Sequence, residues 1–210
     1  METVRVKICG ITNLDDALTA TDAGADALGF NFVPAAPAAR QITPEVAARI
    51  IARLPPFITC VGLVADQDLA PILGTCPLDA LQYYGNEPPE ALRALGVPRV
   101  IKAFRVADEA DITRIEPYIG SIAAALLDAR VPGRLGGTGR AFPWELAVAA
   151  QRYGVPIILA GGLTPANVAE AVRIARPYAV DVASGVEAAP GHKDPEKVRA
   201  FIAAVRSALL

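Results

Sequence analysis

Short apolar segments alternate with longer amphipathic segments along the whole chain. The apolar segments have the length of buried strands, whereas the longer segments carry alanine and leucine at the three- and four-residue spacing of helices. The pattern predicts strands over residues 4–9, 27–32, 58–64, 79–84, 99–104, 122–127, 155–160 and 179–183. It predicts helices over residues 13–23, 44–54, 67–75, 88–95, 108–118, 142–153, 165–176 and 194–209.

Residues at the ends of several predicted helices agree with these boundaries. A side chain that can cap a helix precedes a proline, which is favoured at the first helical position, in Thr43-Pro44, Thr164-Pro165 and Asp194-Pro195. Glycines that can end a helix occur shortly before the next strand, at Gly24, Gly96 and Gly154. Alternation of this kind predicts parallel strands joined by crossover helices.

The eight strand–helix units predict an α/β fold, specifically a single (β/α)8 TIM barrel over residues 1–210. A length of 210 residues with 53% hydrophobic residues is sufficient for one large core, and no change in composition indicates a second domain. A doubly wound open sheet is the alternative that the same alternation allows.

Charge and composition exclude several classes of partner. Charged residues form 20% of the chain without long runs, and the net charge is -2, so we expect neither nucleic acid nor a membrane as partner. No apolar stretch reaches the roughly 18 residues of a membrane span, and the N-terminus lacks the regions of a signal peptide, which predicts a cytoplasmic protein. Three irregularly spaced cysteines and one histidine fit neither a structural zinc site nor a disulfide framework.

Polar side chains and glycines follow the predicted strands, whereas the opposite turns carry almost none. Because active sites of barrel enzymes lie at the carboxyl ends of the strands, this asymmetry predicts an enzyme. The residues at this end are Cys9, Asn31, Phe32, Arg40, Asp66, Gln82, Tyr84, Lys102, Arg105, Asp128, Arg130, Gly161, Gly162, Ser184 and Gly185.

Two glycine-bearing loops follow the last two predicted strands, with Gly161 and Gly162 in the first and Ser184 and Gly185 in the second. Glycine lets backbone N–H groups approach a phosphate closely, and these two loops form the phosphate site of many barrels. Tight turns alone are the alternative explanation for the glycines. We expect a phosphorylated small molecule as substrate.

Cys9 ends the first predicted strand, in which Val4, Val6 and Ile8 alternate with polar residues. An unpaired cysteine is most often a small buried hydrophobic residue. Cys9, however, lies at the carboxyl end of a strand, after Lys7 and near the backbone amides of the next helix. These surroundings can lower the pKa of a thiol, and the thiol can then serve as base or nucleophile. We interpret Cys60 and Cys76 as packing residues. We interpret His192, which follows no predicted strand, as a surface loop residue.

Asp128 directly follows the apolar run 122–127. Its carboxyl group is therefore expected in apolar surroundings at the same end of the barrel as Cys9. Partial burial raises the pKa of a carboxyl group and can make it a general acid near neutrality. Pairing with Arg130 or Arg134 is the structural alternative, and the residues alone leave both open.

Arg40 is the only charged residue among the alanines and prolines of the loop 33–41. A guanidinium in this place can hold a carboxylate through two parallel hydrogen bonds, or it can be a solvated loop residue. The glycine-rich segment 134–140 can cover the site or act as a flexible connector.

These motifs resemble the phosphoribosylanthranilate isomerase family, which consists of (β/α)8-barrel enzymes of tryptophan biosynthesis. The likeness covers nearly the whole length, and its opening and closing motifs are specific in combination. The motifs are Lys7-Ile8-Cys9-Gly10-Ile11-Thr12-Asn13, Gly24-Ala25-Asp26-Ala27-Leu28-Gly29-Phe30, Pro55-Pro56-Phe57, Leu126-Leu127-Asp128, Gly136-Gly137-Thr138-Gly139, Leu159-Ala160-Gly161-Gly162-Leu163-Thr164-Pro165 and Val180-Asp181-Val182-Ala183-Ser184-Gly185-Val186-Glu187.

The resemblance implies an Amadori rearrangement of N-(5-phosphoribosyl)anthranilate to 1-(2-carboxyphenylamino)-1-deoxyribulose 5-phosphate, without a cofactor or a metal. It implies that Asp128 protonates the ring oxygen while the sugar opens to a Schiff base, and that Cys9 removes the C2 proton. Arg40 matches the residue that holds the anthranilate carboxylate, and Asp181 matches a further site position. The phosphate loops match Gly161, Gly162, Ser184 and Gly185. We expect a monomer or a homodimer.

The chain departs from the family pattern at three places. Tyr84 replaces a histidine after the fourth strand, and tyrosine can donate a hydrogen bond but does not titrate near neutrality. Asp66 stands after the third strand, where an aromatic residue is also lost, and Pro143 interrupts a motif before Trp144. We expect these changes to affect the pocket wall rather than the acid and the base.

Two other functions remain open on the sequence. A related barrel can act on another phosphorylated aminoaldose, as the histidine-pathway isomerase does, but Cys9 stands where that family has its first aspartate. A barrel that binds a phosphorylated ligand without catalysis is suggested only by Tyr84 and Asp66. Assays with both substrates, and a search for binding without turnover, distinguish the three.

Overall fold

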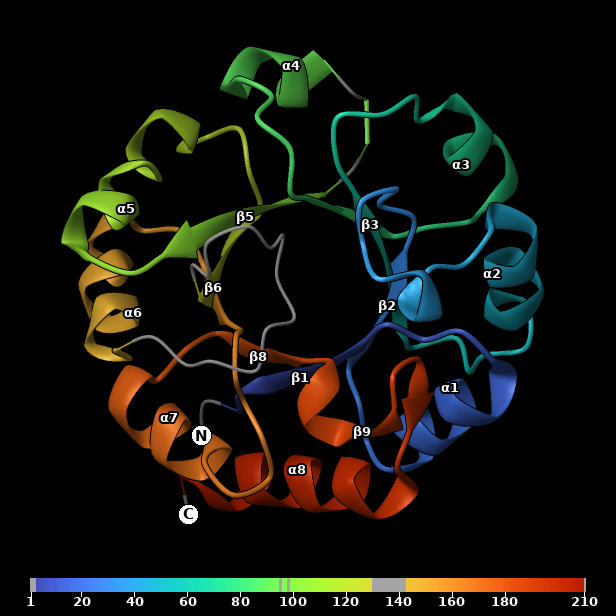
Figure 1. The fold of residues 1–210 in the computed structure, drawn as a ribbon. Helices are drawn as coiled ribbons and strands as arrows, with labels where there is room; N and C mark the ends of the chain where they lie inside the picture. The colour runs from blue at the N-terminus through green and yellow to red at the C-terminus, as the bar shows by residue number, and fades with distance from the viewer. Residues whose placement is uncertain (1–2, 95, 98, 130–142, 210) are drawn as a thin grey trace.

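Eight parallel strands close into a barrel in the computed structural model of the protein, with the helices outside it (Figure 1). The structure describes residues 3–94, 96–97, 99–129 and 143–209. Each strand pairs with the next in chain order, and β1 pairs with β8, which confirms the predicted (β/α)8 barrel and excludes the open sheet. The strands are β1 (Arg5–Cys9), β2 (Ala27–Asn31), β3 (Thr59–Val64), β4 (Ala80–Tyr83), β5 (Val100–Val106), β6 (Ala124–Ala129), β7 (Ile157–Leu159) and β8 (Ala179–Val182).

The helices between the strands follow the predicted order but are mostly shorter than predicted. Two of the predicted helices, 108–118 and 142–153, end in separate 3-10 turns, η2 (Glu116–Tyr118) and η3 (Gln151–Tyr153). The α-helices are α1 (Leu14–Asp22), α2 (Pro44–Ile51), α3 (Ala70–Thr75), α4 (Pro89–Ala94), α5 (Glu109–Thr113), α6 (Glu145–Ala150), α7 (Val168–Ala175) and α8 (Pro195–Ser207).

The predicted proline caps are confirmed at Thr43 and Asp194 but are wrong at Thr164. The side chains of Thr43 and Asp194 accept hydrogen bonds from backbone N–H groups of α2 and α8. By contrast, α7 begins only at Val168. The reason is that the Asn167 side chain accepts a bond from the N–H of Thr164 over 2.7 Å and donates to the carbonyl of Gly162 over 3.0 Å, which holds this segment as a turn against the glycine loop.

The strands present two faces with different contents. Residues such as Val6 and Ile8 pack with the helices in the large outer core. Because side chains alternate along a strand, Lys7 and Cys9 face the barrel interior. The lower interior is filled by a purely apolar cluster drawn from the strands and the residues next to them, comprising Val61, Ala80, Ile101, Ala103, Ala124, Leu126, Ile158, Ala160 and Ala179. On β1 and β8, the interior-facing Lys7, Cys9 and Asp181 lie on the carboxyl-terminal side of this apolar cluster's Ala179.

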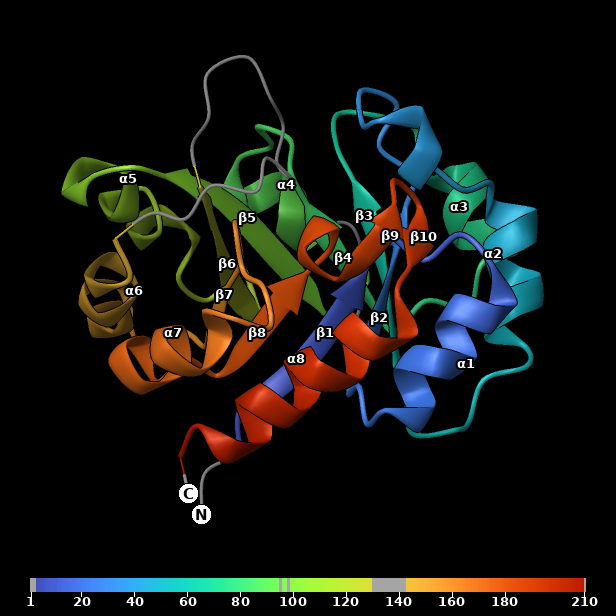
Figure 2. The same ribbon diagram turned by 60° about the horizontal axis from the view of Figure 1, so that its bottom comes forward.

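A short hairpin that the sequence pattern does not predict follows β8. After the 3-10 turn η4 (Ser184–Val186), β9 (Glu187–Ala189) pairs antiparallel with β10 (His192–Lys193). His192 is exposed, as predicted for a surface residue, but it lies in a strand rather than in a loop. Figure 2 shows the hairpin at the end of the barrel toward which the arrows of β1 and β8 point. No helix in the described ranges has the length and apolar character needed to cross a membrane.

We expect Asp194→Ala to lower the free energy of unfolding by about 1 kcal/mol, because it removes the acceptor that caps α8. Asp194 Oδ1 accepts from the N–H groups of Glu196 and Lys197 over 2.9 and 3.1 Å. Urea denaturation measures the change. Asp194→Asn is the matched control, because asparagine caps about equally well, and equal losses in the two variants would contradict the capping role.

Candidate active site

A pocket of about 620 Å³ opens at the carboxyl ends of the strands. Its wall includes all eight residues that the sequence selects as site residues, although they come from five different strand ends and loops. These residues are Cys9, Arg40, Asp128, Gly161, Gly162, Asp181, Ser184 and Gly185. The barrel therefore brings together one thiol, two carboxyl groups, one guanidinium and two glycine loops.

Cys9 ends β1 with its thiol buried, and the residue is 5% exposed. Gly29 on the neighbouring strand leaves the space for it, since a Cβ at position 29 would lie 2.8 Å from the sulfur and 3.0 Å from Lys7 Nζ. Burial raises the pKa of the thiol above its usual value, opposed by Lys7 and Lys193 and aided by Asp181. The lowered pKa that the sequence suggests is thus wrong, because burial outweighs the nearby cations.

Lys7 and Asp181 form a buried ion pair next to Cys9. They are register partners on β1 and β8, and Lys7 Nζ lies 2.8 Å from Asp181 Oδ1. Burial by itself lowers the pKa of Lys7, but the negative charges of Asp181 and Cys9 outweigh it and raise the pKa above its usual value. A fixed positive charge therefore lies beside the thiol.

Asp128 lies on β6 and is 3% exposed. Burial, followed by repulsion from Asp181, raises its pKa to about 6, although the Ala129 N–H, Arg105 and Lys7 act in the opposite direction. Gly161 makes room for the carboxyl group, because a Cβ there would lie 2.7 Å from Asp128 Oδ1. The predicted raised pKa agrees with this result. The alternative partners Arg130 and Arg134, like the glycine-rich segment 134–140, lie outside the described residues.

The two glycine loops meet above the last two strands. Gly161 and Gly162 have positive φ values of 80° and 68°. A Cβ at Gly185 would lie 1.9 Å from the carbonyl oxygen of Leu163, so only glycine allows this contact between the loops. Within the described part of the chain, the backbone N–H groups of Gly161, Gly162, Ser184 and Gly185 donate to no other residue. All four residues line the pocket, and backbone N–H groups in glycine-bearing loops of this kind can bind an anion.

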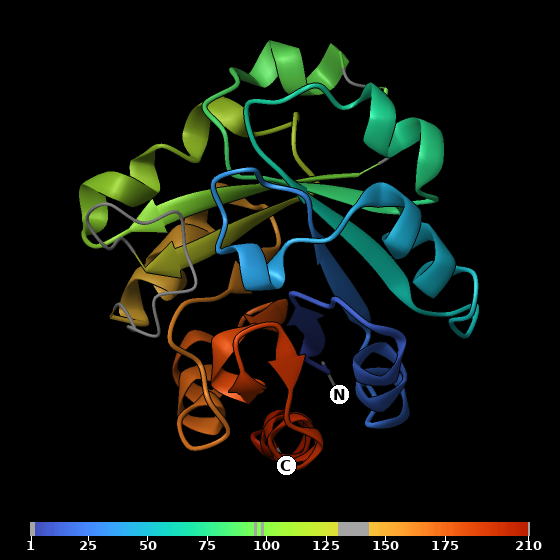
Figure 3. The same cartoon turned by 45° about the vertical axis from the view of Figure 1, so that its right-hand side comes forward.

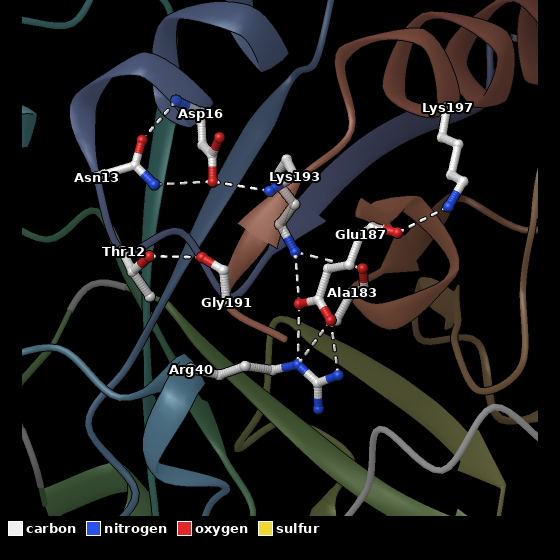
Figure 4. Close-up of polar contacts among 9 residues, drawn as sticks. All are labelled: Thr12, Asn13, Asp16, Arg40, Ala183, Glu187, Gly191, Lys193 and Lys197. Carbon is white, nitrogen blue, oxygen red and sulfur yellow. Dashed lines mark hydrogen bonds and ion pairs between the residues drawn. The ribbon is translucent and has the colours of Figure 1, made fainter. Parts of the chain in front are cut away.

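Arg40 ends the 3-10 turn η1 (Ala38–Arg40), the light-blue turn in front of the barrel in Figure 3. Its side chain lines the pocket. Its guanidinium is held by Glu187 of β9, which in turn contacts Lys193 of β10 (Figure 4). Arg40 is therefore not a solvated loop residue. Glu187 and Lys193 were not predicted as partners of Arg40, because the short strands that carry them have no strong sequence pattern.

Of the three departures from the family pattern, only Tyr84 reaches the pocket wall. Its hydroxyl accepts a hydrogen bond from Gln82 Nε2 over 3.2 Å. Burial, followed by the charges of Asp128, Asp181 and Cys9, raises the pKa of Tyr84 well above its usual value, so the hydroxyl stays protonated. Asp66 is exposed and accepts from the N–H of Asn86, and neither it nor Pro143 lines the pocket, which corrects the expectation for these two positions.

The remaining cysteines pack as predicted. Cys60 and Cys76 are buried in the outer core, and burial is the main cause that raises their pKa values to about 12 and about 11. All three cysteines are free thiols. Within the described ranges, no group of three or more histidine, cysteine or acidic side chains is arranged to hold a metal ion.

Comparisons with known proteins agree with this geometry. A family model described as N-(5'phosphoribosyl)anthranilate (PRA) isomerase matches residues 6–204. A curated N-(5'-phosphoribosyl)anthranilate isomerase from Geobacter sulfurreducens is 56% identical over 202 residues, which cover 95% of this chain and 97% of the relative. The chain belongs to the N-(5'-phosphoribosyl)anthranilate isomerase family. The family predicted from the motifs is thereby confirmed, and this protein is an isomerase.

Solved structures of the family superimpose closely on this isomerase. The phosphoribosyl anthranilate isomerase of Thermotoga maritima has a TM-score of 0.88 at 42% identity, with 97% of this chain and 98% of that chain covered. Another has a TM-score of 0.85 at 40% identity, with 97% and 98% covered, and was solved in complex with reduced 1-(o-carboxyphenylamino)-1-deoxyribulose 5-phosphate. The family match also sets aside the histidine-pathway alternative.

We expect Gly29→Ala to lower kcat roughly 100-fold, because the added methyl group displaces the Cys9 sulfur or Lys7 Nζ from its position. Steady-state kinetics on the isomerase measure this. Gly74→Ala is the matched control, since a Cβ there meets no atom within 4 Å. Equal activity in both variants would contradict the requirement for space at position 29.

Proposed function

We propose that this isomerase converts N-(5-phosphoribosyl)anthranilate to 1-(2-carboxyphenylamino)-1-deoxyribulose 5-phosphate, with Asp128 as general acid and Cys9 as general base. The observation that carries the proposal is that a raised-pKa carboxyl group and a thiol beside a cation open into one pocket with two glycine loops. These are the groups that a cofactor-independent isomerisation of a phosphorylated aminosugar needs.

The reaction requires two proton transfers in sequence. Asp128 donates a proton to the ring oxygen as the C1–O bond breaks, and the nitrogen lone pair forms an iminium cation. This cation acidifies the C2–H bond, so a thiolate at Cys9 suffices to remove that proton and form the enolamine. The enolamine then tautomerises: C1 gains a proton, the C2 hydroxyl group loses one, and the ketone product forms. No electrons enter or leave overall, because the oxidation at C2 balances the reduction at C1.

Separate residues of the site bind the two anionic groups of the substrate and support the thiol. We infer that the N–H groups of Gly161, Gly162, Ser184 and Gly185 hold the phosphate, and that Arg40 holds the anthranilate carboxylate. Asp181 keeps the Lys7 ammonium beside the thiol through their 2.8 Å ion pair. Lys7 then stabilises the thiolate that the second step requires.

We infer that the enzyme acts in the cytoplasm as a monomer or a homodimer. A related structure, at 39% identity and a TM-score of 0.84, is described as mutually generated monomers of the dimeric isomerase from Thermotoga maritima, so this fold is compatible with both states.

We expect Cys9→Ser and Asp128→Asn each to lower kcat/KM by roughly 10² to 10⁴-fold, because each removes one proton-transfer group. The loss of substrate fluorescence reports turnover. Cys76→Ala, which alters a buried packing thiol, is the control and should keep nearly full activity. Full turnover in either site variant would refute its assigned role, and a folded wild-type protein that binds the substrate without turnover would favour the non-catalytic alternative.

We expect kcat/KM to fall about tenfold for each unit by which the pH is lowered below 6. Above pH 6, kcat/KM should be constant up to the raised pKa of the thiol. Between the two pKa values, Asp128 and Cys9 together hold one proton. The fraction of enzyme molecules that have a protonated Asp128 and a thiolate at Cys9 is then constant. Below pH 6 both groups are protonated, so the base is lost. Rate measurements from pH 4 to 9 test this, with exposed Asp15→Asn as a control that keeps the same limb. A rate that rises steadily below pH 6 would exclude the assignment.

A further inference from the structure

Glu187 is a buried carboxylate at the centre of a cluster that the proton-transfer steps do not use. Arg40 Nε donates to Oε1 and Oε2 of Glu187 over 2.9 and 3.2 Å, and Arg40 Nη2 donates to Oε2 over 2.7 Å. On its other side, Lys193 Nζ donates to Oε1 over 3.2 Å (Figure 4). Glu187 is 8% exposed and the Lys193 side chain is fully buried.

The hydrogen bonds occupy only one edge of the Arg40 guanidinium. The Nε and Nη2 donors face Glu187, while Figure 4 shows Nη1 pointing away from it. A guanidinium has five N–H donors in a planar fork, so the end formed by Nη1 and Nη2 still offers two parallel N–H groups. Arg40 can therefore hold a second carboxylate without releasing Glu187.

The charges of the cluster favour an anion in the pocket. Arg40 and Lys193 contribute two positive charges and Glu187 one negative charge, so one positive charge remains. A Cβ at Gly10 would lie 3.6 Å from Arg40 Cδ and 3.7 Å from Lys193 Nζ, which places the Arg40 side chain and the Lys193 ammonium next to the residue after Cys9. Glu187 thus keeps two cations together and leaves one net positive charge near the thiol.

The same hairpin fixes the loop that carries Arg40. A Cβ at Gly191 would lie 1.8 Å from the carbonyl oxygen of Ala39, so the hairpin turn packs directly on η1. Thr12 Oγ1 donates to the carbonyl of Gly191 over 2.7 Å and joins the loop after β1 to the same turn. The contact between Glu187 and Arg40 is therefore part of a junction of three loops (Figure 4).

We propose that Glu187 is a positioning residue that aims the free edge of the Arg40 guanidinium at the carboxylate on the aromatic ring of the substrate. Glu187 thereby sets the preference of this isomerase for a carboxylated arylamine. The proposal rests on the proposed role of Arg40. Lys193 compensates the charge of Glu187 in the buried cluster, so that the full charge of Arg40 is available to the substrate.

The test compares two stable ligands that differ only in the recognised group. These are the reduced 1-(o-carboxyphenylamino)-1-deoxyribulose 5-phosphate and the same compound without its carboxyl group. Calorimetry gives a Kd for each with the wild-type protein, and the carboxylated ligand should bind roughly 10- to 100-fold more tightly, as expected for charge-assisted hydrogen bonds. Glu187→Gln should reduce this ratio by roughly 10-fold and leave the Kd of the ligand without the carboxyl group unchanged.

Two further variants complete the experiment. Glu196→Gln makes the same chemical change at an exposed position of α8 and should keep the wild-type ratio. Glu187→Asp keeps the charge beside Lys193 but shortens the side chain that reaches Arg40, so it should also lower the ratio, and it serves in place of Glu187→Gln if that variant does not fold.

Three results would overturn the proposal. Unchanged Kd values for both ligands would mean that Glu187 does not act through Arg40, and an increased ratio would mean that Glu187 competes with the substrate for the guanidinium. An equal rise of both Kd values, which leaves the ratio unchanged, would indicate a purely structural role. A failure of the proposed function is distinct from these results, since it would appear in the wild-type protein as equal affinity for the two ligands or as no turnover.

Discussion

Lys7 and Asp181 meet inside the barrel because β1 pairs with β8, the ladder that closes the ring. The pair places a cation next to the Cys9 thiol and an anion near Asp128, so it shifts the pKa values of both side chains. Burial raises the pKa values of the Cys9 thiol and the Asp128 carboxyl group. Lys7 of the ion pair opposes the rise at the thiol, and Asp181 adds to the rise at the carboxyl group. The protonation chemistry of the site therefore depends on ring closure.

Small residues are as important to the site as charged ones. Gly29 leaves room for the thiol, Gly161 for the Asp128 carboxyl group, and Gly185 for the carbonyl of Leu163. In each case a methyl group would enter space that a functional or structural atom occupies. The Cys9 thiol and the Asp128 carboxyl group can be buried and still line a pocket because the neighbouring strand and loop contribute no side chain at these points.

The second organising feature is the hairpin after β8, which joins the loops that follow β1 and β2 at the mouth of the pocket. Its Glu187 neutralises part of a dense cationic cluster and holds it in one arrangement, which an isolated arginine in a loop of alanines and prolines would not maintain. The position of the Arg40 guanidinium and the arrangement of loops at the pocket mouth thus depend on the same segment.

The sequence by itself determined the alternation of strands and helices and the family, because hydrophobic periodicity and local motifs encode strands, helices and loop chemistry directly. It favoured a closed barrel over an open sheet, and the pairing of β1 with β8 decided between them. It also selected Cys9, Asp128 and Arg40, each marked by its position at a strand end or by its isolation in a loop. The direction of the thiol pKa shift, the turn held by Asn167, and the partnership of Glu187 with Arg40 were decided only by the tertiary structure. Burial and contacts between residues such as Arg40 and Glu187, which are far apart in the chain, exist only once the ring has closed, so no local pattern records them.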